Sequence, residues 1–256
     1  MVKKMSTFDT EKPRFRDDRL ARLEHIERWH FWFISRRALV NRLLSKYIGN
    51  EKKTFLDIGC GTGNMVEILS AQGHKVVGLD LLPQGLHSTR HSVPNSMLIQ
   101  ADLSIQLPFS ENVFDVVIVL DVLEHVDDES LLEEVNRVLL SGGIIVLTVP
   151  AFPWLWSFRD KDAGHLRRYT RKSIHDLMSK SDLQIIETRY YQFFLFPIIA
   201  FTRFIGRKRK KARDFEDQPV WVVNKILSWI NKFEVWLGDF IPPPYGSSLV
   251  VVCQKS

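Results

Sequence analysis

The feature that most constrains the fold is a regular alternation of short apolar segments with helix-like segments between Thr54 and Pro150. Segments that are apolar throughout are typical of strands in a parallel sheet that helices cover on both faces. We therefore predict an α/β fold built on a doubly wound, mostly parallel sheet. The expected strands are 54–58 (TFLDI), 75–79 (KVVGL), 96–100 (SMLIQ), 114–120 (FDVVIVL), 144–149 (IIVLTV), 183–191 (LQIIETRYY) and 247–254 (SSLVVVCQ).

The chain before the first strand is predicted to form a long helix from about Arg19 to Ile48, because apolar residues recur there at helical spacing. The aromatic cluster WHFWF, residues 29–33, is wider than one helix face needs. It either packs on the core or forms a lid over a ligand.

Residues 151–169 lack a regular pattern, and a loop of about twenty residues in a compact domain is usually functional. A helix capped by Thr170 is expected next. We divide the chain into 1–50, a leader and lid helix; 51–190, the core; 191–246, an apolar and basic helical insertion; and 247–256, the last core strand. The residues expected to face inward from the capped helix are Ile174, Leu177 and Met178.

Composition excludes several classes of protein. Cys60 and Cys253 lie far apart in sequence, so neither a disulfide framework nor a zinc site is expected, and a reducing compartment fits best. The net charge of +5 is local, because residues 203–213 carry seven basic residues and no acidic one. A nucleic-acid partner is therefore not expected. The N-terminus has no apolar stretch of a secretory signal, which predicts a cytoplasmic protein.

Three glycines at alternate positions, Gly59, Gly61 and Gly63, follow the first strand directly. In open α/β sheets a ligand usually contacts this first strand-to-helix turn, and glycine lets the backbone approach it closely. Position 64 is Asn, so the pattern is G-x-G-x-G and departs from the dinucleotide fingerprint G-x-G-x-x-G.

Three acidic residues at strand ends indicate the kind of ligand: Asp57, Asp80 and Asp102. Asp57 would repel a pyrophosphate beside the glycine loop, but it suits a cationic amino group. Asp80 can accept hydrogen bonds from ribose hydroxyls, and Asp102 can accept one from an adenine amine. Together these preferences describe an aminoacyl-type nucleoside.

In these motifs the sequence resembles the class I S-adenosylmethionine-dependent methyltransferases. LDIGCGTG is similar to their first motif, VVGLD to the second, ADL to the third, FDVVIVLDVLEHV to the fourth and LLSGGIIVLTVP to the fifth, in order over residues 54–150. The resemblance implies a Rossmann-like sheet of seven strands that ends in an antiparallel pair, and S-adenosyl-L-methionine as the cofactor.

The resemblance also implies roles for individual residues. Asp57 and the backbone of Gly59, Cys60, Gly61 and Gly63 would hold the methionine moiety. Asp80 and Leu81 would hold the ribose, and Asp102 and Leu103 the adenine. Leu120 and Asp121 would border the methyl group.

Asp121, Glu124 and His125 would share one face if a helix began at Asp121, because their spacing is i, i+3 and i+4. His125 could then act as a general base, with Asp121 also a catalytic candidate. Alternatively, D-x-x-E-H resembles the motif of metal-assisted ubiquinone-type O-methyltransferases. A third interpretation, in which the pair braces the helix, remains open, and no metal is assigned.

HLRRY, residues 165–169, supplies a second candidate base, His165. Arg167 and Arg168 could bind a phosphate or carboxylate of the acceptor, because guanidinium groups match both. Tyr169 and Trp32 are further candidate acceptor contacts. The segment could equally be a solvated charged turn. It resembles an element of methyltransferases associated with glycan or lipid-linked biosynthesis.

The insertion raises the question of a membrane. Its first apolar run is shorter than the roughly twenty residues that span a bilayer, and Pro197 interrupts it. The basic tract follows, and residues 219–241 then predict an amphipathic helix. The insertion is either a monotopic membrane patch or a substrate cap whose apolar faces pack against the N-terminal helix.

We therefore expect a methyltransferase that O-methylates a lipid-linked glycan or isoprenoid-type acceptor. It would be a peripheral protein at the inner face of a membrane, with the anionic membrane surface as its partner. A quinone-like or other small-molecule methyltransferase, with or without a metal, is one alternative. A cofactor-binding scaffold without catalysis is another. No oligomeric state is predicted.

Overall fold

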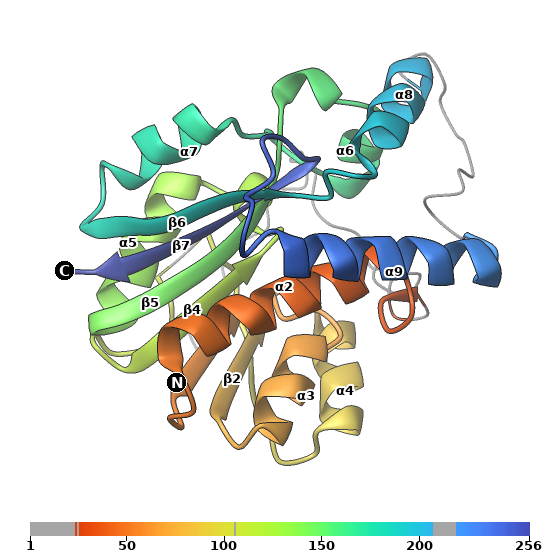
Figure 1. Ribbon diagram of the computed structural model, residues 1–256. Helices are drawn as coiled ribbons and strands as arrows, with labels where there is room; N and C mark the ends of the chain where they lie inside the picture. The colour runs from red at the N-terminus through yellow and green to blue at the C-terminus, as the bar shows by residue number, and fades with distance from the viewer. Residues whose placement is uncertain (1–23, 25, 105, 207–218) are drawn as a thin grey trace.

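One seven-stranded sheet organises the molecule, in the order β3-β2-β1-β4-β5-β7-β6 (Figure 1). This computed structural model describes residues 24, 26–104, 106–206 and 219–256. β7 runs antiparallel to both of its neighbours, and the other pairs are parallel. The predicted fold class is confirmed. The strands are β1 (Thr54–Ile58), β2 (Lys75–Asp80), β3 (Met97–Gln100), β4 (Phe114–Leu120), β5 (Leu139–Pro150), β6 (Leu183–Tyr191) and β7 (Ser248–Lys255).

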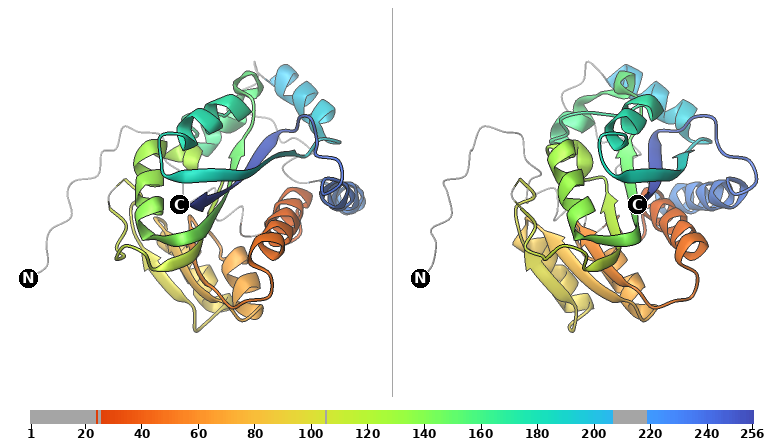
Figure 2. Two further views of the ribbon diagram at one scale, coloured as in Figure 1. Left: turned by 60° about the vertical axis from the view of Figure 1, so that its left-hand side comes forward. Right: turned by 90° about the vertical axis from the view of Figure 1, so that its left-hand side faces the viewer.

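Helices cover both faces of the sheet (Figure 2). The buried side chains of α2 and α3, with Leu86 of α4, pack on one face, and those of α5 and α7 pack on the other. The helices are α2 (Phe31–Ile48), α3 (Asn64–Ala71), α4 (Pro83–Ser92), α5 (Asp128–Val138), α6 (Phe158–Ala163), α7 (Arg171–Met178), α8 (Phe196–Gly206) and α9 (Trp221–Leu237), with short 3-10 turns η1 (Leu123–His125) and η2 (Pro153–Leu155).

The helix before the first strand differs from the prediction, because α2 begins at Phe31 and a turn precedes it. His30 has extended backbone angles, φ −68° and ψ 134°, and its Nδ1 accepts a hydrogen bond from the Trp32 N–H at 3.2 Å. The first turn of α2 is therefore capped rather than continued from the preceding turn. Part of the predicted helix, including Leu20 and Leu23, lies outside the described residues.

The segment after β5 is more regular than predicted, since it contains η2 and α6. The cap at Thr170 is confirmed by a capping box with Ser173, and Ile174, Leu177 and Met178 are buried as predicted. α5 ends at Val138, and Gly142 and Gly143 lie within β5.

Helix α9 lies alongside α2 in every view (Figures 1 and 2). Asn224, Ser228, Asn231 and Glu234 are buried. The apolar side is exposed, which is the reverse of an ordinary amphipathic helix on a globular core. The predicted apolar face of α9 therefore does not bury against α2, although Leu227 packs in one cluster with Phe31 of α2. The substrate-cap alternative remains a prediction. The exposed residues of that side include Val222, Ile226, Trp229, Phe233 and Trp236.

Candidate active site

The candidate site lies where β1 and β4 are neighbours, at the carboxyl ends of the strands, which is where ligands bind in such sheets. Gly59, Gly61 and Gly63 all have positive φ angles. A Cβ atom on Gly59 would lie 2.4 Å from Val122 Cγ2, whereas one on Gly61 would have no heavy atom within 4 Å. Gly59 thus lets the loop pack against the turn after β4, and Gly61 leaves open space beside the backbone.

The three strand-end acids have different environments. Asp57 is 3% exposed, and burial raises its pKa to about 7, although the charge of Arg36 opposes the rise. Asp80 accepts hydrogen bonds from the Gly61 and Leu82 N–H groups, both at 2.8 Å. Asp102 is half-buried, and its Oδ1 accepts bonds from the backbone and hydroxyl of Ser104. Asp80 therefore ties the glycine loop to the end of β2.

Asp121 follows β4 in a strained conformation, with φ 55°. Its Oδ1 accepts a hydrogen bond from the Thr148 hydroxyl at 3.0 Å, and its Oδ2 accepts one from Arg36 Nη1 at 2.5 Å. Because Asp121 lies before the η1 turn, it does not share a helix face with Glu124 and His125, contrary to the prediction.

Glu124 is fully buried, and among the described residues neither of its carboxylate oxygens has a hydrogen-bond partner. Burial, followed by the charge of Asp121, raises the pKa of Glu124 well above its ordinary value. His125 lies beside it, with Nδ1 3.3 Å from the Gly164 carbonyl oxygen.

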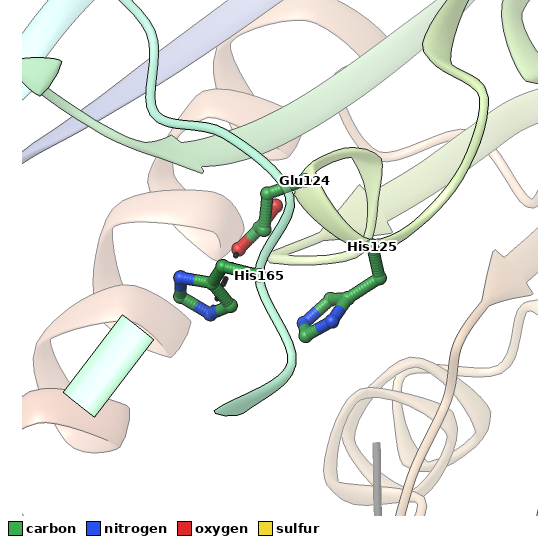
Figure 3. Close-up of side chains that lie close together, drawn as sticks. All are labelled: Glu124, His125 and His165. Atoms are coloured by element: carbon green, nitrogen blue, oxygen red, sulfur yellow. Dashed lines mark ion pairs between the residues drawn. The ribbon is translucent and has the colours of Figure 1, made fainter. Parts of the chain in front are cut away.

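His165 joins this pair from the loop before α7 (Figure 3). Its Nε2 lies 3.8 Å from Glu124 Oε1, and its ring meets that of His125 edge to face, with centroids 4.8 Å apart. The three residues offer ligand atoms that all lie within 4.8 Å of one another, so they could hold a metal ion. The structure thus joins the two candidate bases, which the sequence placed in separate motifs.

The other residues of HLRRY lie differently from the prediction. Arg168 is buried, and its guanidinium donates to Asp160 Oδ1 at 2.6 Å and to the Ala151 carbonyl at 2.9 Å. The Tyr169 hydroxyl donates to Asp128 Oδ2 at 2.9 Å inside the fold. The polar groups of both residues are thus engaged inside the fold rather than directed at a methyl acceptor. The side chain of Arg167 is 37% exposed and forms an ion pair with Asp128.

The remaining predicted residues take varied positions. Trp32 is partly buried and packs against a small apolar cluster that joins α2 to α8 and α9. Leu81 and Leu103 are half-buried at the ends of β2 and β3, and Cys60 and Leu120 are buried at the ends of β1 and β4.

Comparison with known proteins identifies the core. Residues 56–147 match the sequence model of the family described as "Methyltransferase domain". This part of the chain is a class I methyltransferase domain. The match coincides with the glycine loop, the three acids and the η1 turn, so the predicted family is confirmed, and S-adenosyl-L-methionine is confirmed as its cofactor.

Several relatives of the methyltransferase domain have names. A Mycolicibacterium smegmatis protein named "Probable S-adenosylmethionine-dependent methyltransferase" is 24% identical over 162 residues, 62% of each chain. A ubiquinone biosynthesis O-methyltransferase of Sodalis glossinidius is 28% identical over 131 residues, 49% of this chain and 53% of that one. The chain spans 43% to 62% of the length of the first curated relatives.

The solved S-adenosylmethionine-dependent methyltransferase of Mesorhizobium loti resembles the fold, with a TM-score of 0.57 and 17% identity. The alignment covers 85% of this chain and 98% of that one. At this identity the likeness shows the fold alone.

The site of the methyltransferase domain fits an amino-acid nucleoside on its own geometry. Besides the open backbone at Gly61, Arg36 presents a buried Nε atom that lacks a hydrogen-bond partner among the described residues. An uncompensated guanidinium nitrogen beside Asp57 and Asp121 suits the carboxylate of a methionine moiety. The sequence analysis did not single out Arg36. Its one signal in the sequence is that a basic residue stands on the helix predicted to cover the site.

Proposed function

We propose that the chain transfers a methyl group from S-adenosyl-L-methionine to a hydroxyl of a lipid-linked acceptor at a membrane surface. One observation carries this proposal. The open glycine loop with its acids and the Glu124–His125–His165 cluster both adjoin the turn after β4. A cofactor site and a proton-accepting site thus lie next to each other.

The cofactor would be held by Asp57 and the backbone of the glycine loop at its cationic amino group, and by Arg36 at its carboxylate. Asp80 would hold the ribose and Asp102 the adenine. When bound, the cofactor supplies a methyl group already activated by the positive charge on sulfur. The protein then mainly positions the acceptor and excludes water, which can contribute roughly 7–11 kcal/mol.

The acceptor hydroxyl must lose a proton, and His165 is the base we favour, with His125 beside it. A general base contributes typically about 10²- to 10⁴-fold to such a step. Asp121 would act indirectly, since it holds Arg36 over the cofactor site by the 2.5 Å ion pair.

The lipid-linked nature of the acceptor rests on the surface of the insertion. α8, α9 and the turn after α9 expose many large apolar side chains, and extended exposed apolar surface marks a site of interaction with a protein or a membrane. Among the described residues no helix is long and apolar enough to cross a membrane. We propose that the apolar surface lies in the interface at the cytoplasmic face of a membrane, where basic residues such as those of the tract 203–213 are attracted to anionic lipid. These exposed residues include Ile198, Phe201, Phe204, Trp221, Trp229, Phe233, Trp236 and Phe240.

The proposal is tested by incubating the protein and methyl-labelled cofactor separately with a membrane-lipid extract and with a soluble metabolite extract. We expect label in the lipid extract only, and none with Asp80→Ala, which weakens cofactor binding. Label from the soluble extract alone would overturn the lipid-linked acceptor. Cofactor binding by calorimetry without any turnover would favour a non-catalytic scaffold.

A quinone-like small-molecule acceptor with metal assistance is the second candidate. The Glu124–His125–His165 group and the similarity to a ubiquinone biosynthesis O-methyltransferase favour it. Label in a soluble quinol-type acceptor that disappears with a chelator and returns with added Mg²⁺ or Zn²⁺ would support this reaction over the first.

A further inference from the structure

Asp160, at the start of α6, lies at the centre of a buried polar network that the methyltransferase motifs do not include. Its carboxylate is 1% exposed and accepts hydrogen bonds from the Ser157 N–H at 2.8 Å, from Arg168 at 2.6 Å and from Arg203 at 3.0 Å. Two guanidinium groups, of Arg168 and Arg203, lie within ion-pair distance of this carboxylate and favour its charged form. Asp160 is therefore an anion that can only accept hydrogen bonds.

This anion determines which nitrogen of His165 carries the proton. The Nδ1 atom of His165 lies 3.0 Å from Asp160 Oδ1, so the contact is a hydrogen bond only if Nδ1 carries hydrogen. In the neutral ring the lone pair is then on Nε2. Nε2 lies on the side of Glu124 and His125 (Figure 3). The unprotonated nitrogen thus faces the cluster where we place the acceptor.

Arg203 connects this network to the apolar surface. It belongs to α8, and its Nη1 donates to Asp160 Oδ2 at 3.0 Å and to the Ser157 hydroxyl at 2.9 Å. Phe201 and Phe204 of the same helix are 65% and 70% exposed. One helix therefore carries both the exposed apolar side chains and a ligand of the anion behind His165.

We propose that Asp160 and Arg203 are positioning residues for His165: Asp160 keeps the ring proton on Nδ1, and Arg203 holds Asp160 in place from α8. This inference rests on the proposed function. The proton of the acceptor hydroxyl moves to Nε2, and the resulting imidazolium lies against the Asp160 carboxylate, as in other histidine bases oriented by an aspartate. The charged and titratable groups near the ring are Asp160, Glu124, His125 and Arg168, with Arg203 behind Asp160.

The first test needs no acceptor. Long-range proton–nitrogen NMR spectra of protein labelled with ¹⁵N-histidine report the tautomer of each ring, and His165→Gln identifies the His165 peaks. We expect the Nδ1–H form in the wild type. In Asp160→Asn the amide NH₂ can donate to Nδ1, so the Nε2–H form should appear; Arg203→Gln should give a mixture. An Nε2–H ring in the wild type, or identical His165 peaks in all three proteins, would overturn the inference.

The second test uses the lipid extract as acceptor. We expect the turnover of Asp160→Asn to fall about 100-fold and that of Arg203→Gln about tenfold, whereas Arg203→Lys, which keeps the charge, stays within about threefold. Cofactor affinity should not change, and the pH–rate profile of Asp160→Asn should shift. Asp162→Asn removes an exposed charge from the same helix and is the matched control.

The outcomes separate the two proposals. If the wild type does not bind the cofactor, the proposed function is contradicted, but the measurement of the His165 tautomer still tests the inference. If Asp160→Asn does not fold, as circular dichroism would show, Arg203→Gln and Arg203→Lys decide alone. Wild-type turnover and an unshifted pH–rate profile in Arg203→Gln would show that the network is only structural.

Discussion

At the scale of single residues, we expect Asp57 to give the methyltransferase domain a pH-dependent affinity for its cofactor. The pKa of Asp57 is raised to about 7 by burial, so the carboxyl is largely neutral at pH 6 and ionised at pH 8. Only the ionised form attracts the cationic ligand. We expect calorimetry to show binding about tenfold weaker at pH 6 than at pH 8, because the ionised fraction at pH 6 is about one tenth.

Asp57→Asn should bind the cofactor weakly at both pH values and lose this dependence. Asp182→Asn, which changes an exposed acid remote from the loop, should behave as the wild type. An affinity that does not vary with pH in the wild type would contradict the assignment of Asp57 to the cationic end of the cofactor.

Glu124 should make the folded state less stable as the pH rises. Burial holds its pKa well above the unfolded value, so the folded protein binds a proton that the unfolded chain has lost above about pH 5. The stabilisation that this bound proton provides is complete at low pH. It is lost as the pH rises toward the pKa that Glu124 has in the folded state. Glutamine keeps the shape of the protonated acid and cannot ionise.

Urea denaturation at pH 5 and pH 8 therefore tests the state of Glu124. We expect Glu124→Gln to gain stability relative to the wild type as the pH increases, since the contribution of Asp57 is common to both proteins and cancels. An equal difference between the two proteins at pH 5 and pH 8 would show that Glu124 does not change its protonation on unfolding.

At the scale of elements, the contact between α9 and α2 depends on Asn224. Its Oδ1 accepts a hydrogen bond from the Phe31 N–H at 2.8 Å, and its Nδ2 donates to the Trp29 carbonyl at 2.7 Å. Asn224→Ala removes both partners from the start of α2 and should cost about 1–3 kcal/mol of unfolding free energy. Lys232→Ala, on the exposed side of α9, should stay within about 0.5 kcal/mol. Urea denaturation measures both, and equal midpoints would contradict the role of Asn224 in holding α9 to the start of α2.

The same contact shows where sequence reasoning succeeded and failed. The strands and the glycine loop could be predicted because their apolar runs and turn residues act locally. The start of α2 could not, because the N–H of its first residue, Phe31, donates to Asn224, almost two hundred residues further along the chain. The three-residue face from Asp121 to His125 failed for another reason: Asp121 adopts φ 55°, which no helix accommodates.

The candidate site, like the fold, was predictable only in part from the sequence. The acids at Asp57, Asp80 and Asp102 follow from strand ends, so the sequence located them. The pairing of His165 with Glu124 and Asp160 depends on how the segment after β5 folds back over η1, for example through the Leu166 N–H bond to the Glu124 carbonyl at 2.7 Å. The proposed boundaries at 190 and 247 remain a prediction.

At the scale of the whole molecule, the exposed side of α9 defines how the protein would meet a bilayer. Trp229, Phe233 and Trp236 of α9 and Phe240 of the following turn form a continuous series of neighbouring rings. Aromatic side chains bury roughly 150–250 Å² each when fully enclosed. Even partial insertion of two rings, at about 25 cal/mol per Å², amounts to a few kcal/mol of binding free energy.

Flotation with vesicles tests this surface. We expect the wild type to float with vesicles that contain anionic lipid. The double change Trp229→Ser and Phe233→Ser should reduce binding by at least about tenfold, because it removes two of the four aromatic rings of this series. Met97→Ser, which changes a 62% exposed residue on β3 at the other edge of the sheet, should float as the wild type. Neutralising Arg207 to Lys211 should remove the preference for anionic lipid but keep some binding to neutral vesicles. A wild type that stays with the soluble fraction for both vesicle types would contradict the membrane surface, and the acceptor would then have to reach His165 from solution.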